Sequence, residues 1–382
     1  MDFYSTNSLS WEQLEYGTKA MMNLHYGLIH VGLPTMVDLT RDNLPNIKED
    51  NMPKNFELCK EGDVAFADAS EDTNEVAKPI EFFDLAGKNI VCGLHTIHGR
   101  DNKNKTVIGF KGYAFSSSAF HNQIRRIAQG TKIYSISTKN FSECFIGIPS
   151  KVEQTKIATL LRLIDERIAT QNKIIEDLKK LKSAIIDYAI NSLDTDFAKF
   201  GSLYETAGEG GTPTTSNASF YDNGKIPFVK IDDLKQKYLT ENKDFITELG
   251  LQKSSAWLVP TRSILFSNGA TIGEITITTY PVCTKQGILG IVPKSNIDVE
   301  FLYYFMSSTY FKKAISRIVT EGTMKTAYLK DIANILCPIP TKEKQQGIAK
   351  MPSALNSKID YEQSLLKLFI MQKQYLLRQM FI

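Results

Sequence analysis

Apolar residues between positions 151 and 191 recur at alternating steps of four and three, which is the spacing of one face of a helix. The row consists of Ile157, Leu161, Ile164, Ile168, Ile175, Leu178 and Ile185, with Gln171 and Lys182 in the two gaps. No proline occurs between Pro149 and Pro213. The pattern predicts one long helix, roughly 60 Å in length at about 1.5 Å per residue.

A comparable row lies near the C-terminus, with Ile348, Met351, Leu355, Ile359, Leu366, Phe369 and Leu376 on one face. Pro352 interrupts its start, and proline is tolerated in the first turn of a helix, so we expect this helix to begin just before Pro352. Each apolar face needs a partner, which favours an antiparallel coiled-coil pair. The residues predicted to pack in the pair are Ile157, Leu161, Ile164, Ile168, Ile175, Leu178, Ile348, Leu355, Ile359, Leu366 and Phe369. The alternative is that each helix packs on its own globular segment.

The two predicted helices open with the same motif. The stretch Ile148–Ile168 recurs 191 positions later as Ile339–Ile359, with Pro149/Pro340 and Gln154/Gln345 in register. A weaker echo relates 64–67 to 264–267. A repeat of this length indicates duplicated domains. The expected segments are a globular part at 1–148, a helix at 149–192, a second globular part at 193–338 and a second helix at 339–382.

Both globular parts mix strand-like runs with turns. We predict strands at 226–231, after the turn signal Asn223-Gly224, and at 263–267 and 287–292, and one amphipathic helix at 299–318. The expected fold class is therefore α+β, with two globular α/β domains separated by a pair of long antiparallel coiled-coil helices.

Composition narrows the class of protein. The chain has 382 residues, 42% of them hydrophobic, and a net charge of +3. No apolar run approaches the roughly 20 residues of a membrane span, so we expect a cytoplasmic protein without membrane contact. The five cysteines form no CxxC pair, and His95 and His98 have no nearby ligand cluster. We therefore expect buried structural thiols and no metal.

Motifs for catalysis are missing. The glycine-rich stretch 208–213 lacks the lysine and hydroxyl residue of a phosphate-binding loop, so we predict a tight turn there. The chain contains no GxSxG and no GxGxxG after a strand. We expect no catalytic residues and no cofactor of its own.

Basic and amide side chains gather in several predicted loops and short helices. Lysine and arginine bind phosphates, and Arg, Lys, Asn and Gln read base edges. The candidates for DNA contact are Asn102, Lys103, Lys105, Arg125, Arg126, Lys132, Lys230, Asn268, Lys285, Gln286, Lys312, Lys313, Arg317 and Lys325. Among them Asn102, Lys103, Asn268, Lys285 and Gln286 are the candidates for base reading. A solvated surface is the alternative meaning of any single patch.

The chain resembles the specificity subunit of type I restriction-modification systems. The residues that carry the resemblance are the two helix openings at 148–158 and 339–349, together with 3–10, 25–27, 210–213 and 226–229. One departure is that Phe3–Thr6 aligns near Leu203–Thr206, so the lead-in expected before the first domain is short.

The resemblance implies two target-recognition domains that each read one half of a split DNA sequence. It also implies that the two helices act as a spacer and dock two methyltransferase subunits, which hold S-adenosylmethionine and methylate adenine. Motor and nuclease subunits are further partners implied by the family. A coiled-coil adaptor that binds no DNA, and an enzyme with an unfamiliar active site, are the two rival interpretations.

Overall fold

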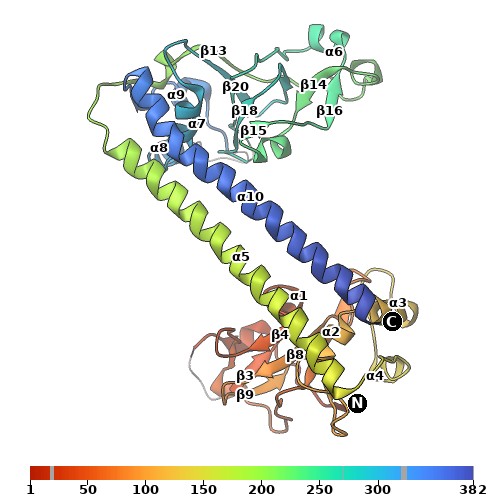
Figure 1. Ribbon diagram of the computed structural model, residues 1–382. Helices are drawn as coiled ribbons and strands as arrows, with labels where there is room; N and C mark the ends of the chain where they lie inside the picture. Colours follow the sequence, from red (N-terminus) through yellow and green to blue (C-terminus); the bar gives the residue numbers. More distant parts are fainter. Residues whose placement is uncertain (18–20, 270, 320–324, 382) are drawn as a thin grey trace. The chain divides into compact units, whose positions relative to one another are not determined.

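The computed structural model describes residues 1–17, 21–269, 271–319 and 325–381 (Figure 1). The chain forms two compact units: unit 1 comprises Met1–Lys173 and Ser364–Ile382, and unit 2 comprises Ile174–Gln363. The boundary crosses the two long helices, α5 (Lys151–Asn191) and α10 (Lys342–Met380). Each unit therefore contains a globular head and a part of both helices.

The two heads share one sheet topology. In unit 1 a five-stranded sheet has the order β1-β10-β6-β8-β4, and in unit 2 the order is β13-β20-β17-β18-β15. The strands of unit 1 are β1 (Asp2–Tyr4), β4 (Met36–Asp38), β6 (Val64–Ala67), β8 (Pro79–Asp84) and β10 (Thr96–Arg100). Those of unit 2 are β13 (Tyr204–Glu209), β15 (Tyr238–Leu239), β17 (Ile264–Ser267), β18 (Ile275–Thr278) and β20 (Ile288–Pro293). In both sheets the last pair is parallel and the other pairs are antiparallel.

A second, smaller sheet also recurs. In unit 1 β5 (Asn46–Ile47), β3 (Met21–Leu24) and β9 (Asn89–Cys92) follow one another, with β2 (Leu14–Glu15) added at the edge. Unit 2 has β16 (Asp244–Ile246), β14 (Ile226–Val229) and β19 (Cys283–Thr284) in the same order. The same two sheets therefore occur in both heads, in agreement with the duplication seen in the sequence.

Short helices complete each head. Unit 1 contains α1 (Tyr26–His30), α2 (Lys111–Phe115), α3 (Ser118–Ile127), α4 (Thr138–Phe141) and the 3-10 helices η1 (Trp11–Gln13) and η2 (Glu49–Asn51). Unit 2 contains α6 (Glu248–Gln252), α7 (Val299–Ser307), α8 (Thr309–Ile318), α9 (Leu329–Ile332), η3 (Phe200–Ser202), η4 (Ala218–Phe220) and η5 (Ile231–Lys235).

The predicted helix at 299–318 is two helices, which corrects the sequence analysis. Ser308 has an extended backbone with ψ of 154° and ends α7, and its hydroxyl accepts a hydrogen bond from the backbone N–H of Phe311 at the start of α8. Ser117 caps α3 in the same way through Phe120. A serine cap satisfies a backbone donor only where a helix begins, so the apolar periodicity concealed a break.

The two long helices pack side by side within each unit. In unit 1 the Nζ atom of Lys373 lies 2.6 Å from Asp165 Oδ1, and Arg167 stacks on the ring of Phe369. In unit 2 Lys182 Nζ donates to Asn356 Oδ1 over 3.0 Å. In unit 1 the partner positions on α10 fall from 373 to 369 as those on α5 rise from 165 to 167, so this pairing is antiparallel. All of the residues predicted to pack in the pair are buried or half-buried.

Two further expectations about local structure were wrong. Pro352 lies inside α10, where it is buried, and the helix begins ten residues earlier at Lys342. The stretch 208–213 is not a tight turn, because β13 extends to Glu209 and the next turn begins only at Thr215. A Cβ atom on Gly210 would lie 2.2 Å from the Thr284 carbonyl, so this glycine serves a close approach of two backbones.

The heads differ at one sheet edge. In unit 2 β12 (Phe197–Lys199), which precedes the head, pairs with β21 (Leu336–Pro338), which precedes α10. The corresponding segment of unit 1, 145–147, has no strand partner among the described residues. There the side-chain amide of Gln123 bonds both the N–H and the carbonyl of Phe145, at 3.1 and 2.9 Å.

Within the described residues, no helix combines the length and the apolar character that a membrane crossing requires.

Candidate nucleic-acid interface

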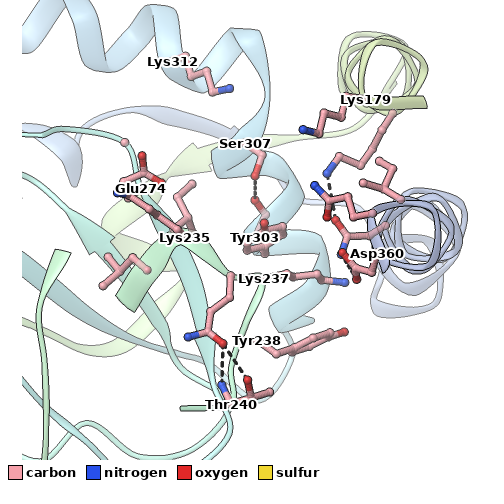
Figure 2. Close-up of a pocket in the computed structure, with 18 residues that line it drawn as sticks. Lys179, Lys235, Lys237, Tyr238, Thr240, Glu274, Tyr303, Ser307, Lys312 and Asp360 are labelled. Atoms are coloured by element: carbon pink, nitrogen blue, oxygen red, sulfur yellow. Dashed lines mark hydrogen bonds between the residues drawn. The ribbon is translucent and has the colours of Figure 1, made fainter. Parts of the chain in front are cut away.

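A pocket of unit 2 is lined by several lysines. It has a volume of about 660 Å³ and lies between the head and the parts of α5 and α10 that belong to this unit (Figure 2). Its cationic residues are Lys179 and Lys182 from α5, Lys235 and Lys237 from the chain around η5 and β15, and Lys312 from α8. The acidic residues in the lining are Glu274 and Asp360. The lining therefore carries an excess of positive charge.

Lys237 is committed to the structure of the pocket wall. Its Nζ atom lies 2.5 Å from Glu300 Oε2 and donates to Tyr304 Oη over 2.8 Å and to Ser353 Oγ over 3.1 Å. Burial lowers the pKa of this lysine, but the hydrogen bonds with Glu300 and the tyrosines outweigh burial and raise it overall. Lys237 thus stays charged and ties the head to α10 within unit 2.

Three other lysines line the pocket, and each has fewer partners for its positive charge than Lys237 has. Lys182 is half-buried, and burial, together with the charges of Lys237, Lys179 and Lys312, lowers its pKa. Lys179 and Lys312 form no ion pair with another described residue. Figure 2 shows these two side chains extending toward one another from α5 and α8. Convergent cations of this kind favour an anionic ligand, because a bound anion relieves their mutual repulsion.

The predicted DNA-contacting residues of unit 2 reach the surface at three places. Lys312, Lys313 and Arg317 are exposed on α8, and Lys325 is exposed nearby, beside a pocket that it shares with Lys312. Lys285 and Gln286 are exposed in the turn between β19 and β20, and the backbone N–H of Gln286 donates to Thr212 Oγ1. Lys230 is exposed and lies 2.7 Å from Asp244 Oδ1.

Asn268 is the exception among the predicted residues. Its side chain is 1% exposed, and its amide donates to the Ala327 carbonyl over 3.2 Å. The residue follows β17 directly, and its backbone carbonyl also accepts a hydrogen bond from the N–H of Ala327, in the segment before α9. Asn268 therefore holds two buried segments together in this structure and presents no group to a base.

The predicted residues of unit 1 are all exposed. Asn102, Lys103 and Lys105 lie in the loop after β10, where the Asn102 amide donates to Asp2 Oδ2 and Tyr4 Oη. Arg125 and Arg126 lie on α3, and Lys132 lies in the loop that follows it. Arg125 donates to Asn74 Oδ1 over 3.0 Å, which fixes its orientation on the surface.

Equivalent basic helices occur in the two heads. Ser117 and Ser308 are the matching caps of α3 and α8, and Arg126 and Arg317 occupy the same position nine residues after the cap. Both arginines are exposed. The two heads thus present one cationic side chain at the same place in the fold, as a pair of equivalent phosphate-binding surfaces requires.

Sequence reasoning missed the lysines of α5 and of the η5 segment. Lys182 interrupts the apolar row of α5, and a cation at a buried position of a stripe is the signal that could have identified it. Lys179, Lys235 and Lys237 carry no such signal, because their proximity depends on the packing of the head on the helices.

The long helices also leave apolar side chains uncovered. In unit 1 these are Val152, Leu160, Leu163, Leu368, Ile370, Met371 and Tyr375, and in unit 2 they are Ile174, Leu181, Tyr188, Met351 and Tyr361. Leu160, Ile174, Leu181 and Tyr188 form a second apolar row beside the buried face of α5. Large exposed apolar side chains gathered along helices are typical of protein interfaces.

Known proteins are similar to this chain in sequence and in fold. Residues 194–368 match the family model of the type I restriction modification DNA specificity domain. The chain is 31% identical over 173 residues to the type I restriction enzyme MjaIX specificity subunit of Methanocaldococcus jannaschii, which covers 44% of this chain and 39% of that protein. It is 24% identical over 345 residues to the putative type I restriction enzyme MjaX specificity subunit of the same organism, covering 85% and 78%. The chain thus spans well under half of the first relative and about four fifths of the second.

Solved structures share the fold at low identity. The S subunit of a type I restriction-modification system from M. genitalium aligns with a TM-score of 0.54 at 18% identity, over 100% of this chain and 93% of that one. A chain from a study of complex assembly and conformational transition of the type I R-M system aligns with a TM-score of 0.61 at 16% identity, over 90% and 89%. The chain is thus similar in sequence and in fold to type I restriction-modification specificity subunits, and its residues 194–368 match the DNA specificity domain of that family.

Proposed function

We propose that this chain recognises a DNA sequence made of two separated parts and carries methyltransferase subunits to it, without catalysing a reaction itself. The observation that carries the proposal is the duplication: two heads with one topology, each with an exposed arginine at the same place, Arg126 and Arg317. A reader of a single site needs one such head. Two heads on one chain suit two half-sites.

The basic surfaces supply the DNA contacts in this proposal. Lys179, Lys182 and Lys312 bind backbone phosphate in unit 2, and the exposed side chains of the β19–β20 turn, Lys285 and Gln286, read bases. In unit 1 the loop with Asn102 and Lys103 and the helix α3 have the corresponding tasks. Phosphate contacts release counterions, so affinity falls steeply as salt concentration rises.

The uncovered apolar rows are the docking surfaces for partners. Each unit has one set of exposed apolar residues on its part of α5 and α10. Two sets suit two methyltransferase subunits, one for each unit. Those subunits hold the S-adenosylmethionine and perform the methyl transfer, and motor and nuclease subunits join through them. Since the substrate is genomic DNA, the complex works in the cytoplasm.

The test is to map modified adenines in the source genome with and without this gene. We expect a two-part motif with a constant gap to lose its methylation when the gene is deleted. Reintroducing an Arg317→Ala variant should lower methylation at every copy of the motif, because a phosphate contact carries no sequence information. Methylation that is unchanged in the deletion strain would contradict DNA recognition by this chain.

A binding measurement tests the basic pocket of unit 2 separately. The double variant Lys179→Ala/Lys312→Ala should weaken duplex binding and reduce the slope of log affinity against log salt by about one for each lost phosphate contact. Lys253→Ala is the matched control, since Lys253 is an exposed lysine of the same unit outside the pocket. Equal effects of the control and the double variant would remove the pocket from the DNA interface.

A further inference from the structure

Unit 1 buries a cluster of sulfur and nitrogen ligands beneath its sheets. Cys59, Cys92 and His98 are 5%, 2% and 0% exposed. The two Sγ atoms lie 3.5 Å apart, and one ring nitrogen of His98 and both sulfurs lie within 4.8 Å of one another. The three residues come from the segment before β6, from the end of β9 and from β10. Their proximity follows from the fold, since the sequence separates them.

One nitrogen of His98 is already fixed. Its Nε2 atom lies 2.7 Å from Asp63 Oδ2, and Asp63 is also bound by Arg100, whose Nε atom donates to Oδ1 over 2.8 Å. A carboxylate paired with a guanidinium is ionised and only accepts hydrogen bonds, so Nε2 carries the proton. Neutral His98 then has its lone pair on Nδ1. This atom is buried and finds no hydrogen-bond partner among the described residues.

Unit 2 shows that the fold does not require these side chains. The backbone bond from Cys59 N to Ile90 O matches that from Val259 N to Val282 O, and the bond from Gly93 N to Leu24 O matches that from Lys285 N to Val229 O. The strand partners His98–Ala65 and Gly290–Leu265 also correspond.

The three positions are therefore Val259, Thr284 and Gly290 in unit 2. No thiol or imidazole is present there, and the space beside Gly290 is taken by Val259 and Trp257. Two thiols and an imidazole with a free lone pair at this position are thus a property of unit 1 alone.

We propose that Cys59, Cys92 and His98 bind one thiophilic transition-metal ion, with zinc as its first candidate. Two thiolates and a neutral imidazole are ligands that zinc prefers, and an imidazole held by a carboxylate on its other nitrogen is the usual arrangement in metal sites. Asp63 orients the His98 ring and is not a ligand.

The charges balance in this site. Binding Zn²⁺ forms two sulfur–zinc bonds and releases two thiol protons, which leaves the buried group neutral. Among the described residues, no fourth Cys, His, Asp or Glu joins Cys59, Cys92 and His98, so water fills the remaining position. The ion would link β9, β10 and the segment before β6 within unit 1.

The experiment measures metal content in the full chain. Protein purified under reducing conditions is dialysed against zinc and then against metal-free buffer, and its metals are measured by mass spectrometry. We expect one retained zinc ion per chain. Cobalt should give the thiolate-to-cobalt absorption band in the near ultraviolet. The double variant Cys59→Val/Cys92→Thr, which copies the residues of unit 2, should lose both signals.

Controls separate the site from other thiols. Cys337→Ala removes a buried cysteine of unit 2 and should retain the zinc ion and the cobalt band. If the wild-type chain retains no more zinc than the double variant, or if Cys59 and Cys92 are found as a disulfide in protein purified under reducing conditions, the proposal is wrong. Should the double variant fail to fold, the cobalt titration of the wild-type chain decides alone, and an absent thiolate band overturns the site.

Discussion

At the scale of single residues, the repeated glutamine explains why the two helix openings are alike. Gln154 Nε2 donates to the carbonyls of Pro149 and Lys105, and its Oε1 accepts from Val107 N, at 2.9 to 3.0 Å. Gln345 makes the matching bonds to Pro340, Asn296 and Asp298. Each glutamine thus ties the start of a long helix to a loop within its head, which follows β10 in unit 1 and β20 in unit 2.

Removing this amide should destabilise the unit that contains it. Gln154→Ala leaves buried backbone groups unpaired, which costs on the order of 2 kcal/mol. Gln345→Ala should have a similar effect, since its contacts are equivalent. The measurement is denaturant unfolding followed by circular dichroism. Gln346→Ala, at the exposed neighbouring position, should leave the unfolding midpoint unchanged. If the unfolding midpoint of Gln154→Ala equals that of this control, the side chain of Gln154 does not stabilise the junction between α5 and the head.

Glu81 gives unit 1 a pH dependence. Its carboxylate is fully buried, accepts from the backbone N–H groups of Gly109 and Gly112, and lies 3.1 Å from Lys111 Nζ. Burial raises its pKa despite these partners. An acid with a raised folded pKa contributes stability below its ordinary pKa, and this contribution is lost as the pH rises through the folded pKa.

A double-mutant cycle tests the Glu81–Lys111 pair. Glu81→Gln alone leaves the buried ammonium group of Lys111 without its charged partner. This change should lower the free energy of unfolding by about 3 kcal/mol. Glu81→Gln/Lys111→Met removes both charges and should recover most of that loss. The double variant should also lose the decline in stability that the wild type shows above about pH 4.5. Unfolding free energies from pH 4 to 8 measure both effects, and additive single effects would argue against a coupled pair.

At the scale of elements, the long helices have two separate faces. The predicted packing row is buried or half-buried, whereas Leu181 and Tyr188 are 47% and 77% exposed on the same helix. Seven residues at 100° each bring these two side chains to nearly the same direction. An apolar row that the head leaves uncovered is what a partner helix would bury.

Charging this row should detach a methyltransferase subunit. Leu181→Asp/Tyr188→Asp places two desolvated charges in the proposed interface, so co-purification should fall to one methyltransferase subunit per chain, with that of unit 1 retained. Ser183→Asp is the matched control, because Ser183 is exposed about 200° around α5 from Leu181. Native mass spectrometry gives the stoichiometry. Two bound subunits in the double variant would assign docking to another surface.

At the scale of the whole molecule, the helices set the proposed spacing of the half-sites. α5 is a continuous helix of 41 residues that passes from unit 1 to unit 2. A helix lengthens by about 1.5 Å for each added residue. We propose that the length of α5 and α10 between the units determines the gap in the DNA target.

Lengthening both helices should widen that gap. Four residues inserted after Lys173 and four after Gln363, at the boundary of the units, add about 6 Å, or roughly two base pairs at 3.4 Å each. Methylation mapping of a strain with this variant measures the gap. Four residues inserted between Lys54 and Asn55, an exposed bend in unit 1, should leave it unchanged. An unchanged gap in the helix variant would show that helix length does not set the spacing.

The sequence by itself determined the duplication, the extent of α5 and the existence of three strands. These strands were predicted at 226–231, 263–267 and 287–292 and lie at Ile226–Val229, Ile264–Ser267 and Ile288–Pro293. These features follow from local periodicity and from a repeat, both of which are written along the chain. Sequence reasoning failed where a local signal competed with a tertiary one. The buried Asn268 depends on a contact with the distant Ala327 carbonyl, and Pro352 is buried inside α10. The break at Ser308 is a local serine cap that the continuous apolar periodicity concealed.

Tertiary structure alone decided which side chains share a site. The lysines around the pocket of unit 2 come from α5, from the chain around η5 and β15, and from α8, and Cys59, Cys92 and His98 come from three separate segments. Side chains far apart in sequence become neighbours only when sheets and helices pack. The spacing of residues along the chain therefore does not predict which of them form a site. Folding also divided each helix between two units and selected which apolar row is buried, because a helix can turn only one face toward its own head.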